Sequence, residues 1–376
     1  MFGRFMNNYY YGKSGKGDFR KEDMPETRMQ LFWDTLRTRL SGLCRLNLMY
    51  AVAFLPTIIV LIMGVYNLLN RVNVVFNAQQ GTLQEYVDAV QAQQAGENAE
   101  NVQKVVISQE EQEAIAATDV RGLLDSMLFS TLLWLMPCLA ITGPFTAGVS
   151  YVTRNWARDE HAFIWSDFKD AVKENWRKGL VISAITSVLP LAAYVGWKFY
   201  GDMAAKQLIM IVPQVLVMLV GILWSLAVTY MHPLNVSYEL KLGGILRNAF
   251  LLAVARLPMS IGIRLLHCVP ALLTFAAVWF FALDPMIGCL ILAAYYILIG
   301  FGLSRFITAS YTNAVFDRFI NSRIEGAKVN QGLKDADEDD GDDGDDGDED
   351  DGEAETGKEL SGEKPEGTAA AEKVTE

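Results

Sequence analysis

Long apolar runs alternate with polar segments through most of the chain. Six such runs lie near residues 46–69, 123–149, 180–200, 208–231, 265–283 and 286–305. A helix of about 20 predominantly apolar residues crosses the roughly 30 Å hydrocarbon core of a bilayer, whereas the strands of a membrane barrel are shorter and alternate in polarity. The pattern therefore predicts an all-α integral membrane helical bundle with about six transmembrane helices.

The polar segments divide the chain into three parts. We expect an N-terminal segment at 1–45, a membrane domain at 46–325 and a disordered acidic tail at 326–376. The longer connections within the membrane domain are 71–122, 150–179 and 232–264. Because the first apolar run begins only after a long polar stretch, the sequence shows no pattern of a cleavable signal peptide.

Lys and Arg residues are distributed unevenly between the two sides that six spans define. With the N-terminus inside, 27 of the 32 lie in inner segments and five in outer ones. Short cytoplasmic loops are enriched in basic residues. The asymmetry therefore predicts that the protein lies in the cell membrane with both termini cytoplasmic, with 71–122 as an outer loop and with 150–179 and 232–264 as inner loops.

The outer loop has local patterns of its own. Leu83, Tyr86, Val87 and Val90 keep helical spacing, and Ser108 with Glu111 matches a capping box before a second helix. A pair of outer helices is therefore predicted. Two interpretations stay open: these helices extend the first two spans or are partly disordered, or they form a cap that senses a ligand.

An internal similarity suggests repeated structure. Residues 38–56 align with 240–258 without gaps at eight identities in 19 positions, and both segments end in Leu-Pro. Three even-numbered spans also end in a hydroxyl residue followed by tyrosine, at Tyr151, Tyr230 and Tyr311. These features favour three repeated helical hairpins. The alignment leaves open whether the fifth helix begins near 248 or near 265.

Charge separates the tail from the rest of the chain. Residues 335–376 hold 20 acidic residues and three lysines, a net charge of −17, although the whole chain carries −12. The remainder is mildly basic and more apolar, which excludes a uniform soluble acidic protein. The tail is too charged and too poor in apolar residues to fold alone. It matches the calcium-loop pattern only superficially.

Catalytic and metal-binding patterns are missing from the sequence. The four cysteines stand far apart, the three histidines have no partner at metal-ligand spacing, and neither a phosphate-binding loop nor a nucleophile motif is present. The sequence therefore predicts no catalytic residues, no metal ligands and no cofactor, and we expect a non-enzymatic protein.

Aromatic and basic residues alternate in the inner loop after the second span. Such a segment can lie among the headgroups of anionic lipids or dock a partner. Rings and cations that flank two spans are the usual anchoring pattern, which argues against nucleic-acid binding. The candidate lipid- or partner-contacting residues are Arg154, Trp156, Arg158, Trp165, Phe168, Lys173, Trp176 and Arg177.

Ionisable residues are rare within the predicted spans. The best candidates for intramembrane polar residues are Arg256, Arg264 and His267, which also fit an amphipathic segment at the inner surface. A coupled transporter usually requires polar groups of this kind near the middle of the membrane. Prolines within several runs can kink helices, but kinks also occur in static bundles.

Three stretches carry a family resemblance. They are 2–5 with 11–19, Arg45-Leu-Asn-Leu48, and the stretch from Gly143 to Trp156 continued by Asp167-Phe168 and by 173–176. Over residues 1 to about 325 the chain resembles the YesL-like family of bacterial multi-pass membrane proteins, whose function is uncharacterised. The outer loop and the acidic tail look like additions to the family pattern. By analogy alone, the resemblance implies an accessory role beside a carbohydrate ABC transporter.

Two functions follow as hypotheses. The first is a non-enzymatic accessory or regulatory membrane protein, associated with carbohydrate uptake, whose partners are the lipid bilayer with its anionic lipids and an ABC transporter or another membrane protein. The alternative is a small-solute transporter or channel, for which six helices, prolines and a repeat argue. The sequence defines neither a substrate nor an oligomeric state.

Overall fold

The computed structural model describes residues 24–95 and 105–334, and the described residues form helices and no strand. In chain order the elements are α2 (Arg28–Gln80), α3 (Leu83–Ala95), α4 (Gln109–Ala116), α5 (Val120–Ala157), α6 (Ile164–Ala204), η3 (Leu208–Met210), α7 (Ile211–Ser237), α8 (Leu242–Ala255), α9 (Leu257–Phe280), α10 (Pro285–Tyr295), η4 (Tyr296–Gly300), α11 (Phe301–Phe319) and η5 (Asn321–Arg323). The predicted all-α class is confirmed.

Six helices are long and apolar enough to cross a membrane. They are α2, α5, α6, the η3–α7 unit, α9 and the continuous unit from Pro285 to Arg323. The predicted number of spans is therefore confirmed. Several of these helices far exceed the length that a bilayer core requires, because their polar ends continue the helix on either side of the apolar run.

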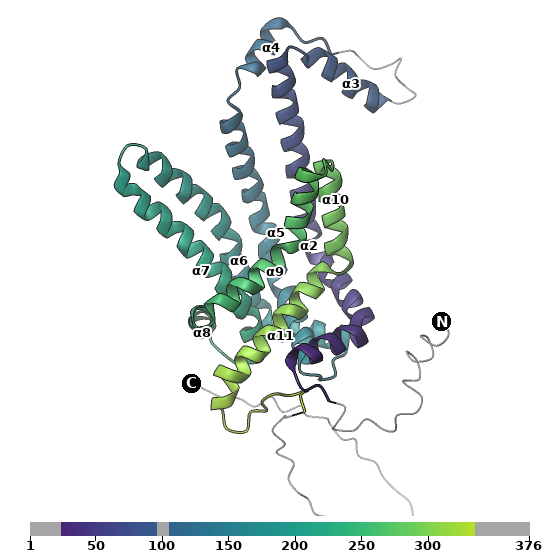
Figure 1. Ribbon diagram of the computed structural model, residues 1–376, viewed down its shortest axis with the longest axis vertical. Helices are drawn as coiled ribbons and strands as arrows, with labels where there is room; N and C mark the ends of the chain where they lie inside the picture. The colour runs from purple at the N-terminus through teal and green to yellow at the C-terminus, as the bar shows by residue number, and fades with distance from the viewer. Residues whose placement is uncertain (1–23, 96–104, 335–376) are drawn as a thin grey trace, which may run out of the picture.

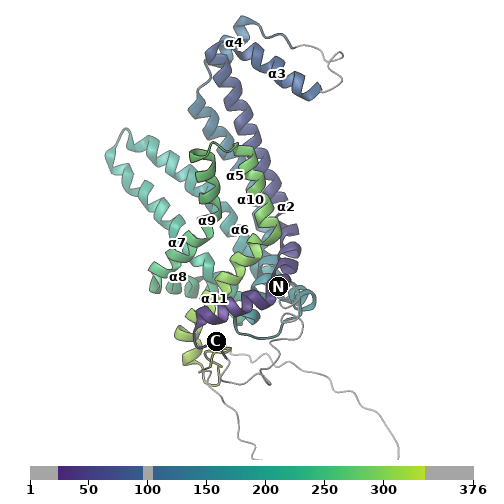
Figure 2. The same ribbon diagram turned by 45° about the vertical axis from the view of Figure 1, so that its right-hand side comes forward.

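The long helices form three hairpins that stand side by side (Figures 1 and 2). The hairpins are α2 with α5, α6 with α7, and α9 with the α10–α11 unit. They converge at the end where α5 leads into α6 and α7 into α8, which we call the basic end. At the opposite end, the loop end, α3 and α4 cap the first hairpin and the second hairpin leans away. Three helical hairpins are therefore present, and their origin as repeats of one unit stays a prediction.

Helix α2 begins well before its apolar run. Thr27 accepts the backbone N–H of Gln30, and the Gln30 side chain accepts the backbone N–H of Thr27, so a capping box opens the helix. Non-helical torsion angles at Arg39 mark a kink (φ −107°, ψ 15°). The predicted N-terminal segment 1–45 therefore contains the first 18 residues of α2, while residues 1–23 lie outside the described residues.

The two outer helices predicted from local patterns are present. Ser108 and Glu111 form the capping box of α4, and α3 follows directly after α2. Gly81 between α2 and α3 has a φ of 78°, a left-handed conformation that glycine adopts without steric cost. The loop 71–122 is thus largely helical, because α2 continues to Gln80 and α5 begins at Val120.

The fifth helix begins between the two starts that the sequence left open. Helix α8 ends at Ala255, the backbone breaks at Arg256, and α9 begins at Leu257 with Pro258 in its first turn. In the aligned segment, Pro56 lies inside α2, well after the kink at Arg39. The aligned prolines therefore occupy different local structures, although both belong to comparable hairpins.

The packed core lies toward the basic end. One cluster joins α7, α8 and α11 with Ile182 of α6, and the other joins α2, α5, α11 and the start of α6. Helices α5 and α6 cross with their backbones in contact at Gly143 and Gly179. Along α9 only Ser260 is buried. The apolar faces of the helix halves toward the loop end therefore remain exposed, which is compatible with insertion into a membrane.

Residues 326–334, which the sequence places in the acidic tail, pack against the bundle. The backbone N–H of Lys334 donates to the carbonyl oxygen of Pro25 (3.1 Å), and Leu333 is buried. This segment therefore closes the basic end beside the start of α2. The remainder of the predicted tail, 335–376, lies outside the described residues.

Candidate functional site at the basic end

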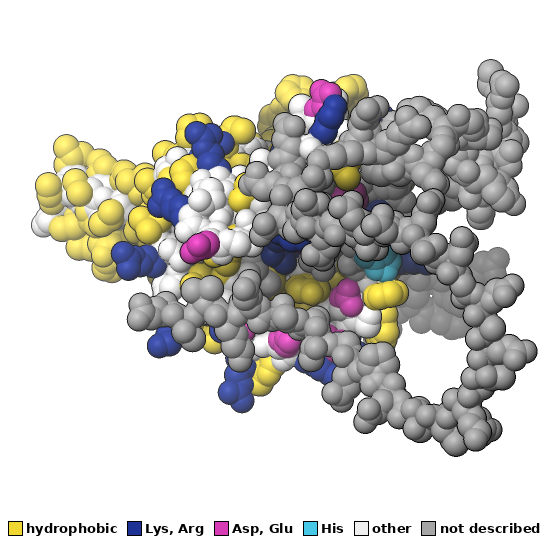
Figure 3. Space-filling model, turned by 90° about the horizontal axis from the view of Figure 1, so that it is seen from below, with side chains coloured by type: hydrophobic (Ala, Val, Ile, Leu, Met, Phe, Trp, Pro, Cys, Tyr) yellow, Lys and Arg dark blue, Asp and Glu magenta, His cyan; other side chains and the backbone are white. Residues whose placement is uncertain are grey.

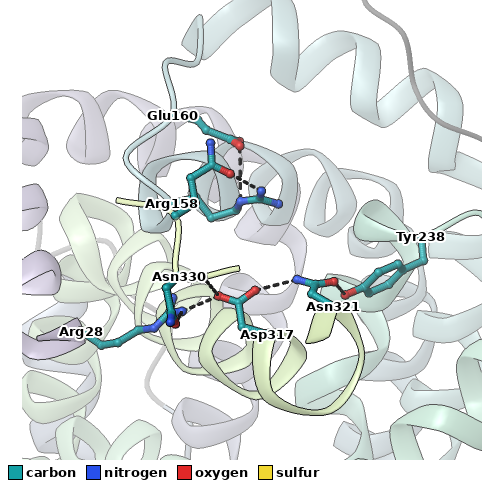
Figure 4. A network of polar contacts seen from close by, with 8 residues as sticks. Arg28, Arg158, Glu160, Tyr238, Asp317, Asn321 and Asn330 are labelled. Atoms are coloured by element: carbon teal, nitrogen blue, oxygen red, sulfur yellow. Dashed lines mark hydrogen bonds and ion pairs between the residues drawn. The ribbon is translucent and has the colours of Figure 1, made fainter. Parts of the chain in front are cut away.

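Asp317 of α11 connects elements from opposite ends of the sequence (Figure 4). Its carboxylate is buried and forms an ion pair with Arg28 at the start of α2. It also accepts the side-chain amide of Asn321 (2.6 Å) and the backbone N–H of Asn330 (3.2 Å). Arg28 donates in addition to the side chain of Asn330 (2.9 Å). A buried carboxylate is tolerated only with such partners, and they fix the N-terminal helix against the end of the chain's last long helix.

The network continues toward α7 through a tyrosine. The Tyr238 hydroxyl donates to Asn321 (2.6 Å), and its ring packs edge-on against Phe316. Burial is the main cause that raises the pKa of Tyr238 above its ordinary value of 10.0. The hydroxyl therefore stays protonated and serves as a hydrogen-bond donor at neutral pH.

A second polar group lies on the link between α5 and α6. Arg158 forms an ion pair with Glu160 (3.3 Å) and donates to the side chain of Gln331 (Figure 4). Arg154, one turn earlier, is half-buried and interacts electrostatically with Tyr238. Of the predicted contact residues, Arg154 and Arg158 thus belong to the structural network of the basic end.

Two of the predicted contact residues are buried in the core: Trp156 at the end of α5 and Phe168 near the start of α6. Trp156 and Phe168 are 3% and 7% exposed and lie in the core cluster, where Phe168 packs against Gly148. Their prediction as lipid- or partner-contacting residues is corrected, because the Trp156 ring packs against Gly42 of α2 and the Phe168 ring against Gly148 of α5.

The other predicted contact residues of α6 are exposed. Trp165 and Trp176 are 67% and 46% exposed, and Lys173 and Arg177 are exposed beside them. With Lys169, these residues form the α6 surface, defined as Trp165, Lys169, Lys173, Trp176 and Arg177. Their spacing places them on one side of the helix. Figure 3 shows the basic end, where Lys and Arg side chains stand among hydrophobic ones.

The side chain of Asn47 in α2 forms hydrogen bonds to the backbone of the sixth span, where that span departs from α-helical geometry. Its side-chain amide donates to the carbonyl oxygens of Tyr296 (3.2 Å) and Ile297 (2.6 Å), and its carbonyl oxygen accepts the backbone N–H of Gly302 (2.6 Å). Residues Tyr296–Gly300 form a π-helix, which leaves backbone groups without their usual α-helical partners. The fully buried Asn47 supplies these partners from a neighbouring helix.

The predicted intramembrane polar residues fall into two groups. His267 donates from Nε2 to the carbonyl oxygen of Ser304 (3.0 Å), and Arg305 interacts electrostatically with both His267 and Arg264. Arg256 lies at the break between α8 and α9, where its charge acts on Tyr230.

A hydroxyl cluster lies next to this break. Tyr230 of α7 bonds to the hydroxyls of Ser260 (2.7 Å) and Tyr311 (2.8 Å). Tyr230 and Tyr311 are two of the tyrosines whose sequence positions correspond in the hairpin pattern. The ends of the second and third hairpins therefore meet through equivalent residues.

Within the described ranges, no group of three or more His, Cys, Asp or Glu side chains is placed to hold a metal ion. The polar residues whose partners the sequence did not predict are Asp317, Asn47 and Arg305. A lone acid in an apolar segment was the one available signal for Asp317. Asn47 lies in the stretch Arg45-Leu-Asn-Leu48 that carries the family resemblance, but its hydrogen-bond partners lie about 250 residues away and no local pattern predicts them.

The fold and this site define a six-helix membrane bundle closed by a polar layer at one end. A family model described as "Protein of unknown function, DUF624" matches residues 127–197, which run from α5 through the α6 surface into the half of α6 toward the loop end. No curated protein and no solved structure matches the chain.

Proposed function

We propose that the protein is a non-enzymatic accessory or regulatory component of a membrane assembly, with its basic end on the cytoplasmic side. The observation that carries the proposal is the α6 surface, which presents two exposed tryptophans and three cations on a rigidly packed helix. Exposed aromatic and arginine side chains on a pre-organised surface are typical of protein interfaces.

At the Trp165 end of the α6 surface, the geometry of α6 favours a protein partner over lipid headgroups, which only the end at Trp176 can reach. Helix α6 is continuous from Ile164 to Ala204, so its first turns extend the span instead of lying along the membrane plane. Trp165 precedes the apolar run at residue 180 by 15 residues, or about 22 Å along the axis. Even at a tilt of 40°, about 17 Å remain, beyond a headgroup layer of roughly 7 Å.

The packing under the α6 surface supports a docking role. The close contacts of Gly143 with Gly179 and of Gly148 with Phe168 hold the first turns of α6 against α5. A partner therefore meets side chains on a fixed backbone, which lowers the entropy cost of association. The charges are of mixed sign, since Asp170 and Glu174 adjoin the lysines, and we expect the partner surface to combine an apolar pocket with both charges.

The family match supports the resemblance to YesL-like proteins, because it includes the stretch 143–176 on which that resemblance chiefly rests. By analogy with members of that family, the membrane subunits of a carbohydrate ABC transporter are the first partners to test.

The test is a crosslinked purification of the tagged full-length protein from native membranes, with quantitative mass spectrometry. The double variant Trp165→Ala/Trp176→Ala removes both rings of the α6 surface. Its control is Trp134→Ala/Trp197→Ala, which removes rings of similar exposure, 65% and 46%, from the apolar halves of α5 and α6. We expect the first variant to lower recovery of a specific partner at least about tenfold, as loss of interface anchors does, and the control to leave it unchanged. Equal recovery from both variants contradicts the proposal.

Transport of a small solute is the second candidate, and the basic and histidine residues of α7, α9 and α11 favour it. It predicts solute flux in proteoliposomes that drops when Arg256 or Arg264 is replaced. The absence of flux over a broad panel of sugars argues against this version.

A further inference from the structure

Four nitrogen-bearing side chains gather where α7, α9 and α11 meet. They are His232 of α7, Arg264 and His267 of α9, and Arg305 of α11, and we call them the α7–α9–α11 cluster. His267 hydrogen-bonds to the Ser304 carbonyl oxygen next to Arg305 (3.0 Å), and Arg264 lies one turn before His267 on α9. The charge of Arg305 acts on Arg264, His267 and His232. The cluster thus brings two guanidinium groups and two imidazoles together from three helices.

The surrounding helices supply no counter-charge. Helices α7, α8 and α9 contain no Asp or Glu, and the unit from Pro285 to Phe319 contains only Asp317. That carboxylate is already bound to Arg28, Asn321 and Asn330. Within the described residues neither Arg264 nor Arg305 forms an ion pair with an acid, although cations in a membrane are normally paired or exposed to water.

Some hydrogen-bonding atoms of the cluster are buried without a partner. They include Nε of Arg264 and Nδ1 of His232, and His232 itself is only 3% exposed. Because the Ser304 carbonyl oxygen can only accept, Nε2 of His267 carries the proton of that bond. Unpartnered buried polar atoms are costly and point to a ligand that satisfies them.

The position of the cluster allows access from the basic end. Arg264 lies seven residues into α9, about 10 Å along the axis from Leu257, and His267 about 15 Å. The neighbouring Leu265 and Leu266 are exposed, because α9 buries little of its surface. An arginine side chain at this depth can extend to the headgroup layer, or it can bind an anion that lies deeper than the headgroups.

We propose that the α7–α9–α11 cluster binds one phosphate-class oxyanion. Two guanidinium groups offer paired N–H donors that match the oxygens of a phosphate. The oxyanion comes either from an anionic phospholipid that enters beside α9 or from a soluble solute. Binding at this place does not depend on a partner at the α6 surface.

The test uses the full-length protein in phosphatidylcholine nanodiscs. One arm titrates inorganic phosphate and follows the thermal unfolding midpoint. The other replaces part of the phosphatidylcholine with phosphatidylglycerol and counts retained lipid by native mass spectrometry. The variants are Arg264→Gln and Arg305→Gln, and the control is Arg247→Gln, which removes one exposed cation of α8 outside the cluster.

We expect saturable binding in at least one arm and at least an approximately tenfold loss of affinity in Arg264→Gln and Arg305→Gln, with none in Arg247→Gln. Binding in the phosphate arm alone identifies a soluble ligand, and binding in the phosphatidylglycerol arm alone identifies a lipid. Arg264→Lys keeps the charge and should retain part of the affinity. It replaces Arg264→Gln in the binding measurement if the glutamine variant fails to fold. No binding in either arm, or the same loss in Arg247→Gln, overturns the proposal.

Discussion

The carbonyl group of Gly179 occupies the place where a side chain at Gly143 would begin. A Cβ atom added at Gly143 would meet the Gly179 oxygen and approach its carbonyl carbon to 2.6 Å and the Ser183 hydroxyl to 2.8 Å. The crossing of α5 and α6 therefore depends on two residues without side chains, as close helix packing in membranes often does.

Gly143→Ala should separate these two helices. Because the obstacle is backbone, the strain cannot be relieved by a side-chain rotation, and we expect a loss of about 1–3 kcal/mol. The measurement is the thermal unfolding midpoint of the purified protein. Gly262→Ala is the control, since a Cβ there meets nothing within 4 Å. Equal midpoints for the two variants would refute the close crossing.

Asp317→Asn should loosen the basic end. The variant leaves Arg28 without its ion-pair partner and weakens the contacts to Asn321 and Asn330. We expect a cost of about 3 kcal/mol, at the lower end for a broken buried pair because the Arg28 side chain is 25% exposed. Limited proteolysis should become faster in 24–28 and in 326–334. The exposed Asp34→Asn is the control, and unchanged proteolysis in Asp317→Asn would contradict the assigned role.

Asn47→Ala should release the π-helix of the sixth span. Three backbone groups lose their side-chain partner, and each unsatisfied buried group costs about 1–3 kcal/mol before any relaxation. Amide hydrogen exchange at Gly302 should therefore accelerate. Asn77→Ala removes contacts confined to the end of α2 and should leave Gly302 unchanged. Equal protection of the Gly302 amide from exchange in wild type and Asn47→Ala would show that the π-helix is stable without the Asn47 side chain.

The capping box of α4 should respond to acid. The backbone N–H of Ser108 donates to the Glu111 carboxylate (2.9 Å) and lowers the pKa of Glu111 below its ordinary value of 4.5. Because the folded pKa is the lower one, the carboxylate stabilises α4 fully above the unfolded pKa, and this contribution is lost as the pH falls through the folded pKa.

We therefore expect amide protection at Ser108, corrected for intrinsic exchange, to fall as the pH drops below 4.5. Glu111→Gln retains a side-chain acceptor but cannot titrate, so its protection should vary much less with pH. A parallel fall in both proteins would assign the effect to another group.

The sequence of this protein determined its class and the number of its spans. The length of an apolar run is a local property, and a bilayer imposes the same minimum length on every helix that crosses it. Local hydrogen bonding also predicted the capping box at Ser108, since a cap needs only residues three positions apart.

Tertiary structure decided which polar residues act together. Trp156 and Trp165 look alike in the sequence, yet one fills the core and the other is exposed, because burial depends on the neighbouring helix. Arg28 and Asp317 pair across 289 positions, and His267 of α9 bonds to Ser304 of α11 only when the third hairpin closes. Such contacts arise from packing between helices, which no local pattern encodes, so the candidate anion site and the closed basic end emerge only in the folded chain.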